Sequence, residues 1–242
     1  MPFTPSHAAA VLPFLRTPLP ATALVIGSIT PDLPFYLPVG FPWRTHTALA
    51  VVTTDLVLGL AAWVVWHGLL AEPALAAAPA PLRGRLPGTA PGLAARLGSA
   101  SRLAWTLLAL AVGAATHVAW DEFTHPRRWG PEHVAVLAQD WGPLPGYRWL
   151  QYGTSVLGGV VLLVWFVRWW RRTPPRPDVR RPGVRWAWLL LGGIGAAAAV
   201  AAAVPAPDLG AAIFAGATWG GMAALGVAAA LAGAWHVRHR TG

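Results

Sequence analysis

The sequence contains no cysteine and no lysine, and it has few charged residues of any kind. Without cysteine there are no disulfides and no thiolate metal sites, so any metal must be held by His, Asp or Glu. Charged residues make up 11% of the 242 residues, whereas a soluble domain usually has about 25%. The mean hydropathy is +0.50. So few charges cannot form a water-facing surface of this size, and we predict that lipid covers much of the chain.

All 18 basic residues are arginine, and they bring the net charge to +9. A strongly basic chain can bind nucleic acid. Here, however, the arginines lie in loops between apolar segments, which is where membrane topology places them. We therefore expect membrane lipid as a partner and no nucleic acid.

Five apolar segments approach the length of about 20 residues that a helix needs to cross a bilayer. They cover residues 48–70, 103–120, 153–170, 186–204 and 210–235. The intervening loops 71–102 and 168–185 and the C-terminus are rich in arginine, and the positive-inside rule places them in the cytoplasm. The predicted fold is an all-α, polytopic membrane helical bundle forming one domain over residues 1–242, with 71–102 as a cytoplasmic loop and 153–235 as three packing helices.

The first 46 residues are expected to form a hairpin of two short helices. Thr4 and Pro5 are typical of a helix start. The run TPLP at residues 17–20 ends the first helix, and a second helix covers about 20–29. Both helices are too short to cross a bilayer, so we expect a re-entrant or tightly tilted hairpin with both ends on the outer side. The N-terminus lacks a basic region ahead of its apolar stretch, so we expect it to be retained rather than cleaved.

Six ionisable residues lie at segment ends on the side predicted to be outside the cytoplasm. They are His7, Asp32, His46, His117, Asp121 and His125. Because the sides were assigned from arginine alone, this convergence is an independent observation. His117 and Asp121 are four residues apart and share one helix face, where an imidazole and a carboxylate can bind one divalent cation. These features favour a metal site at residues 47–130 together with the hairpin.

Each of these residues also has a plainer interpretation. A single His at a membrane interface is commonly just an amphipathic side chain. Asp32 could be a turn residue, and Asp121 could pair with Arg127 or Arg128. The convergence of all six from three separate stretches argues for the shared site. Glu132 or His133 could complete it.

Asp55 stands apart, because it lies well inside an apolar segment, where a carboxylate is usually paired. It follows His46 by nine residues, as Arg16 follows His7. Two α-helices that start at the same level would bring the two side chains to the same depth, roughly 13 Å in. We predict that Arg16 and Asp55 form a structural ion pair.

Four stretches together resemble the DUF4184 family of bacterial membrane proteins: MPFTPSHAAAV, GSITPDLPFYL, RTHT and THVAWDEFTHPRRWG. Their order is similar to that in the membrane-bound metal-dependent hydrolases grouped as DUF457, and distantly to zinc-dependent phospholipase C. The resemblance implies that Asp32, His46, His117 and Asp121 form one zinc site, and that His7 shares Asp121 in a second. His125 resembles a further ligand. No His-x-x-x-Glu pair follows His125, and the nearest candidates are Glu132, His133 and Asp140. The resemblance therefore implies one or two metals rather than three.

The leading hypothesis is a metal-dependent hydrolase in the bacterial inner membrane, with zinc as the expected cofactor and its site facing outward. Asp121 or Asp32 would act as ligand and local base, and Arg44 and Arg127 would hold an anionic group such as a lipid phosphate. One rival is a transporter or metal-handling protein. Another is a structural membrane protein stabilised by zinc. The apolar character of the last two segments argues against a polar path across the bilayer.

Overall fold

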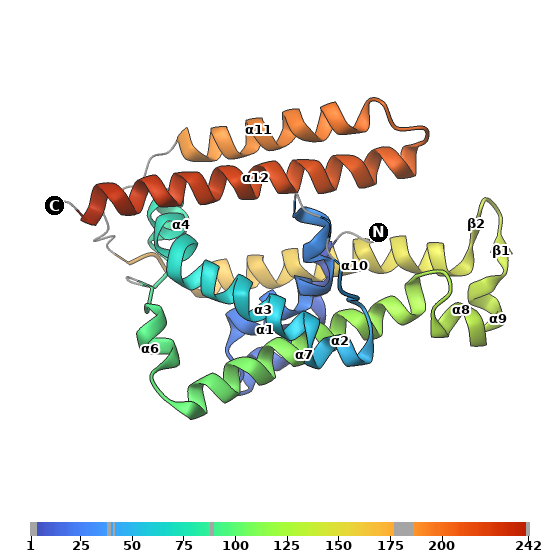
Figure 1. The fold of residues 1–242 in the computed structure, drawn as a ribbon, viewed down its shortest axis with the longest axis horizontal. Helices are drawn as coiled ribbons and strands as arrows, with labels where there is room; N and C mark the ends of the chain where they lie inside the picture. Colours follow the sequence, from blue (N-terminus) through green and yellow to red (C-terminus); the bar gives the residue numbers. More distant parts are fainter. Residues whose placement is uncertain (1–3, 38–39, 41, 88–89, 177–185, 241–242) are drawn as a thin grey trace. The chain divides into compact units, whose positions relative to one another are not determined.

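The computed structural model describes residues 4–37, 40, 42–87, 90–176 and 186–240. Part of the predicted arginine-rich linker, residues 177–185, lies outside the described residues. The described chain is almost wholly helical (Figure 1), which confirms the predicted all-α class. One short hairpin interrupts the helices: strands β1 (Asp140–Trp141) and β2 (Leu144–Pro145) pair antiparallel, with Asp140 opposite Pro145.

The helices follow one another in this order, with η1 and η2 being 3₁₀ helices and η3 a π-helical turn. They are η1 (Thr4–Arg16), α1 (Ala21–Ile29), η2 (Thr30–Tyr36), α2 (Ala48–Val52), α3 (Thr54–Val65), η3 (Trp66–Leu70), α4 (Ala71–Ala77), α5 (Ala80–Arg83), α6 (Leu93–Leu97), α7 (Ala100–Thr124), α8 (Trp129–His133), α9 (Ala135–Ala138), α10 (Gly146–Arg172), α11 (Trp186–Ala203) and α12 (Leu209–Arg240).

Five helical stretches are long and apolar enough to cross a membrane, as predicted. They are Thr54–Ala77, Ala100–His133, Gly146–Arg172, Trp186–Ala203 and Leu209–His239. In the most apolar window of α11 only 6% of residues are buried. A helix that exposes leucine and valine in this way suits a lipid environment, so the five helices fit a membrane protein.

The described residues form two compact units. The first unit contains residues 1–33, 41–63 and 97–169, and the second contains 34–40, 64–96 and 170–242. Residues 71–102, expected to be a loop, include α4, α5 and α6. Alanine is frequent in this stretch, and its high helix propensity accounts for these short helices.

Close packing of α1 on α7 organises the first unit (Figure 1). At their contact, Gly27 of α1 lies against the backbone of Leu110, and Gly113 of α7 lies against the backbone of Leu24 and Ser28. A Cβ atom at either glycine would collide with a carbonyl oxygen. The two glycines thus allow the two backbones to approach closely, as small residues do between membrane helices.

The predicted N-terminal helices are present, but the first is a 3₁₀ helix and the predicted ion pair is wrong. Arg16 is exposed, while Asp55 is buried and neither of its carboxylate oxygens has a hydrogen-bond partner. Two departures from a regular α-helix explain this. A 3₁₀ helix rises about 2.0 Å per residue rather than 1.5 Å. On the other side, the helix after His46 breaks at Thr53, whose φ is −125° and ψ −94°.

In the second unit, α11 and α12 lie side by side along most of their length (Figure 1). Small residues again line the contact: Gly195 faces Gly220, and Gly220 faces Ala199. These helices therefore use the same packing principle as α1 and α7.

Candidate metal centre

The centre is built around α7, which presents His117 and Asp121 on one face into the first unit. His117 is completely buried, and Asp121 and Asp32 are each 3% exposed. Asp32 lies in η2, directly after α1, and His46 lies in the loop before α2. The glycine contact of α1 with α7 sits immediately next to these residues, since Gly27 precedes Ser28 and Gly113 precedes His117 by one turn.

Four donor atoms form a closed ring of alternating His and Asp contacts. His46 Nε2 lies 3.1 Å from Asp32 Oδ1 and 3.6 Å from Asp121 Oδ2. His117 Nε2 lies 3.7 Å from Asp32 Oδ1 and 3.4 Å from Asp121 Oδ2. Donors about 2.0–2.2 Å from a tetrahedral zinc ion would be roughly 3.3–3.6 Å apart. Three of these residues, Asp32, His46 and His117, bring their donor atoms close enough together to hold one small divalent cation.

A hydrogen bond at Nδ1 fixes the orientation of the His117 ring, so that its Nε2 faces Asp32 and Asp121. His117 Nδ1 donates to the carbonyl oxygen of Ser28 at 2.7 Å. In a neutral imidazole this leaves the lone pair on Nε2, which points at two carboxylates and has no hydrogen-bond partner. A cation between the atoms, or a proton on Nε2, makes such a contact attractive. A carbonyl that orients the ring from behind is also a common feature of metal-binding His residues.

His7 faces the other oxygen of Asp121. Its ring stacks on that of His117 with centroids 3.8 Å apart, and its Nε2 lies 3.7 Å from Asp121 Oδ1. His7 is fully buried, and neither ring nitrogen has a hydrogen-bond partner. The three residues His7, His117 and Asp121 form one group that could hold a metal ion, and Asp32, His46 and His117 form another. The two groups share His117, and Asp121 presents one oxygen toward each.

Two residues outside the spanning segments are in the protonation states that metal binding requires. Burial, together with the neighbouring His117, lowers the pKa of His7 to about 4. Burial alone would raise the pKa of Asp32, but hydrogen bonds from His46 and from Thr4 and the charge of His117 bring it to about 2. The Thr4 hydroxyl donates to Asp32 Oδ2 at 2.6 Å. Near neutral pH, His7 is thus a neutral base and Asp32 an anion, as metal ligands must be.

The loop that carries His46 is strained and is held from several sides. His46 has a φ of 60°, a left-handed conformation that is uncommon for residues other than glycine. Arg128 donates to the His46 carbonyl oxygen at 2.7 Å and is itself bound by Glu122 at 3.2 Å. Thr45 Oγ1 lies 2.8 Å from His46 Nδ1. Strain that the surroundings maintain in this way often marks a functional residue.

His125 lies beside Asp121 but belongs to neither group. Helix α7 ends at Thr124, so His125 does not continue its face and instead places Nδ1 3.3 Å from Asp121 Oδ1. The amide of Gln151, which is 2% exposed, donates to His125 Nε2 at 3.1 Å. Thr124 Oγ1 lies 3.2 Å from His125 Nδ1, so both ring nitrogens have hydrogen-bond partners. Gln151 was not predicted, and the only sequence signal for it is an amide at the edge of an apolar segment.

Asp55 approaches the same centre rather than Arg16. It interacts electrostatically with His46 and His117 and lies close to the backbone of His46. It thus adds a third buried carboxylate to Asp32 and Asp121. Three acidic side chains are thus buried around the His rings of the centre, an arrangement that a cation would stabilise.

The remaining predicted residues lie at the surface. Arg44 and Arg127 are exposed, and Arg127 has a φ of 58°. Glu132, His133 and Asp140 are also exposed, and His133 Nδ1 bonds the carbonyl oxygen of Trp129 at 2.9 Å. None of these five belongs to a group of described residues that could hold a metal ion.

The fold and this centre define the class: an all-helical protein suited to a membrane, with buried His and Asp groups that could hold a metal ion. A family model described as "Domain of unknown function (DUF4184)" matches residues 1–235. The chain therefore belongs to the DUF4184 family, as its motifs predicted. No curated protein and no solved structure matches the chain.

Proposed function

We propose that the protein is a membrane-bound, metal-dependent hydrolase whose centre is formed by His7, Asp32, His46, His117 and Asp121. The observation that carries the proposal is the set of buried donor atoms with no hydrogen-bond partner: both nitrogens of His7, His117 Nε2 and Asp121 Oδ1. Each unpartnered buried polar atom costs about 1–3 kcal/mol. Cations held by the two groups would satisfy all of them except the far nitrogen of His7.

The donor set favours zinc. Imidazole nitrogens and single carboxylate oxygens suit Zn²⁺, whereas Mg²⁺ and Ca²⁺ prefer oxygen ligands alone. Asp32, His46 and His117, with one oxygen of Asp121, would hold the first ion. His7 and the other Asp121 oxygen offer fewer donors, so a second ion would bind more weakly. The motif resemblance to zinc-dependent phospholipase C implies the same first site and the same second site, in which His7 shares Asp121.

A bound zinc ion would supply Lewis-acid chemistry and activate water for attack on a phosphoryl or acyl group. The chain's own residues would accept the proton and hold the metal ligands in position. Asp121 and Asp32 are ionised acceptors at the centre and can take a proton from the attacking water. His125, held by Gln151, keeps the Asp121 carboxylate in place. Arg128 keeps the strained loop, and with it the His46 ring, in position.

A phosphate-containing lipid is the substrate class that the setting favours. Arg44 and Arg127 are exposed; Arg44 lies two residues before His46, and Arg127 follows the motif that supplies His117. Arginine binds phosphate in two-pronged geometry. Trp43 and Trp129, each within two residues of one of these arginines, are 64% and 51% exposed. Exposed tryptophans at segment ends suit the headgroup level of a bilayer. We therefore propose that the centre faces the outer membrane surface, in the bacterial inner membrane.

The test is metal content followed by turnover. Protein purified in detergent is expected to hold one strongly bound zinc, with a second at higher zinc concentration. His117→Ala should lose it, while His236→Ala, an equally conservative loss of an imidazole in the second unit, should keep it. Wild type should hydrolyse phospholipid or a phosphodiester analogue, and Asp32→Asn should not.

Three results would redirect the proposal. Absence of metal from wild type would overturn it. Metal without hydrolysis, and with thermal stability that depends on zinc, would indicate a structural zinc site instead. Metal with zinc uptake into vesicles would indicate transport.

A further inference from the structure

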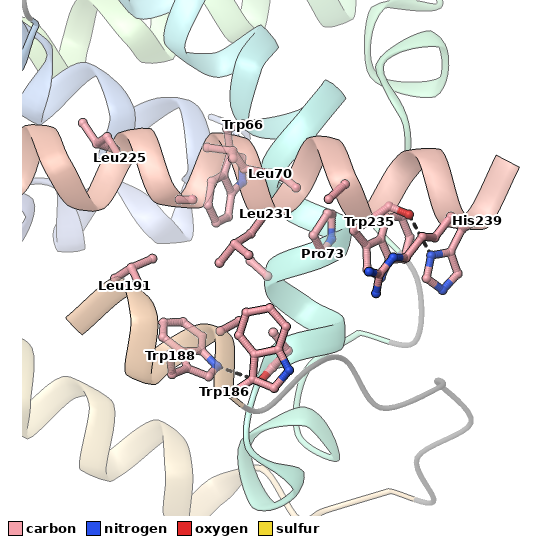
Figure 2. A pocket seen from close by; sticks show the side chains of 17 residues that line it. Trp66, Leu70, Pro73, Trp186, Trp188, Leu191, Leu225, Leu231, Trp235 and His239 are labelled. Carbon is pink, nitrogen blue, oxygen red and sulfur yellow. Dashed lines mark hydrogen bonds between the residues drawn. The ribbon is translucent and has the colours of Figure 1, made fainter. Parts of the chain in front are cut away.

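The second unit contains a cavity that has no part in the metal centre. It lies between α11, α12, η3 and α4 and has a volume of about 410 Å³ (Figure 2). Ligand sites in proteins usually have volumes of about 300–1,000 Å³. Four tryptophans line it, namely Trp66, Trp186, Trp188 and Trp235, and the rest of the lining is mainly leucine and alanine.

The lining changes character along its length. Leu191 and Leu225 lie at one end, whereas Trp235 and His239 lie at the other (Figure 2), and Arg238 belongs to the lining as well. From Leu225 to Arg238 is thirteen residues along α12, or about 20 Å. One leaflet of the hydrocarbon core is roughly 15 Å thick, half of the full 30 Å. The cavity is thus long enough for one acyl chain, and its basic end lies where a headgroup would be.

Among the described residues, the charged side chains at the basic end of the cavity have one sign, and no acidic side chain lines the cavity. Glu72, next to the lining residue Pro73 in sequence, is already bound, because its carboxylate accepts a hydrogen bond from the Ala90 backbone at 3.1 Å. His239 Nδ1 bonds the carbonyl oxygen of Trp235 at 2.8 Å, which holds the ring against the indole. An anionic group would complement this end, and a cationic one would be repelled.

We propose that this cavity binds an anionic phospholipid, with one acyl chain between the tryptophans and the phosphate at Arg238. Basic pockets between membrane helices are known to bind anionic headgroups, and tryptophan is favoured at the level where headgroup and chain meet. The arginine-rich C-terminal end of α12 is the end predicted to face the cytoplasm. The lipid would therefore come from the cytoplasmic leaflet, and it would be a bound component of the fold rather than the substrate of the metal centre.

Native mass spectrometry of the full-length protein in neutral detergent can test this. The probes are phosphatidylglycerol and phosphatidylcholine with identical chains, titrated separately. Wild type should retain one phosphatidylglycerol in preference to phosphatidylcholine. Arg238→Gln should weaken phosphatidylglycerol binding by about fivefold, the effect of one basic residue near a membrane surface. Arg171→Gln, an exposed arginine outside the cavity lining, is the matched control.

A second pair of variants tests the cavity itself. Ala228→Phe places a ring in the cavity and should remove the bound lipid, whereas Ala229→Phe adds the same ring on the exposed face and should not. Equal retention of both lipids by wild type would overturn the role of the headgroup. Wild-type lipid retention by Ala228→Phe would overturn the location. All four variants should keep the metal content of wild type, so failure here is distinct from failure of the metal centre.

Discussion

The two units of this protein bury very different side chains, although both are built from apolar helices packed through small residues. Of the fourteen buried polar or charged residues among those described, twelve lie in the first unit, and only His67 and Thr218 lie in the second. Helix packing alone does not require buried carboxylates, as α11 and α12 demonstrate. The polar interior of the first unit therefore supports the proposal that its buried His and Asp groups hold a metal ion.

The largest effect should come from separating the two helices that bring the centre together. Gly27→Leu would force α1 away from the Leu110 backbone of α7 and would displace Ser28, whose carbonyl orients His117. We expect zinc content to fall to background and the first unit to lose more than about 3 kcal/mol of stability. Metal analysis and thermal unfolding measure the two effects.

The matched control for Gly27→Leu is Gly226→Leu in α12. An added Cβ at Gly226 meets nothing within 4 Å, so this variant should retain both zinc and thermal stability. If Gly27→Leu behaved like Gly226→Leu, the close contact of α1 with α7 would not be what assembles the centre.

Removing the metal should affect the two units unequally. A ligand present at about a thousand times its dissociation constant stabilises the folded state by about 4 kcal/mol. Chelation of zinc should therefore increase amide hydrogen exchange in α1 and α7, and leave α11 and α12 unchanged. Restoration by added zinc is the control for damage by the chelator. A uniform increase over both units would show that the metal does not stabilise the first unit specifically.

Substitution of a residue that contacts a metal ligand, rather than the metal itself, should have an intermediate effect on zinc affinity. Gln151→Leu removes the donor that holds His125 against Asp121, and such supporting partners typically change metal affinity by 10–100-fold. Zinc titration against a chelator of known affinity measures the change. Thr218→Leu, which replaces a buried polar residue of the second unit, should leave zinc affinity unaltered. An unchanged affinity in Gln151→Leu would mean that His125 does not orient Asp121.

The difference between the units was only partly predictable from the sequence. The five spans follow from composition, and the His and Asp residues of the centre follow from helix spacing and from the side to which arginine counts assign them. Asp55 was paired wrongly, because regular α-helices were assumed where the chain forms a 3₁₀ helix and a break at Thr53. Gln151 carries no local pattern, since its role depends on a contact 26 residues away with His125. Contacts of this kind arise from tertiary packing and leave no periodicity to detect.

The smallest effect concerns backbone strain at the centre. Among the described residues other than glycine, only His46 and Arg127 have positive φ, and both belong to the first unit. A left-handed residue costs about 1–2 kcal/mol unless it is glycine. Both substitutions remove the His46 imidazole, so the two variants are compared in metal-free protein. There, His46→Gly should be about 1 kcal/mol more stable than His46→Ala. Thermal unfolding of the two variants measures this difference.

The same pair of substitutions at Leu49, an exposed position in α2, should give the opposite sign. Glycine in a helix is about 1 kcal/mol less favourable than alanine. A pair at His46 that followed the order seen at Leu49 would mean that the loop relaxes without metal. The strain would then be imposed by the bound ion rather than by Arg128 and its neighbours. Either order thus identifies what holds His46 in its conformation, and whether the first unit is preorganised for metal.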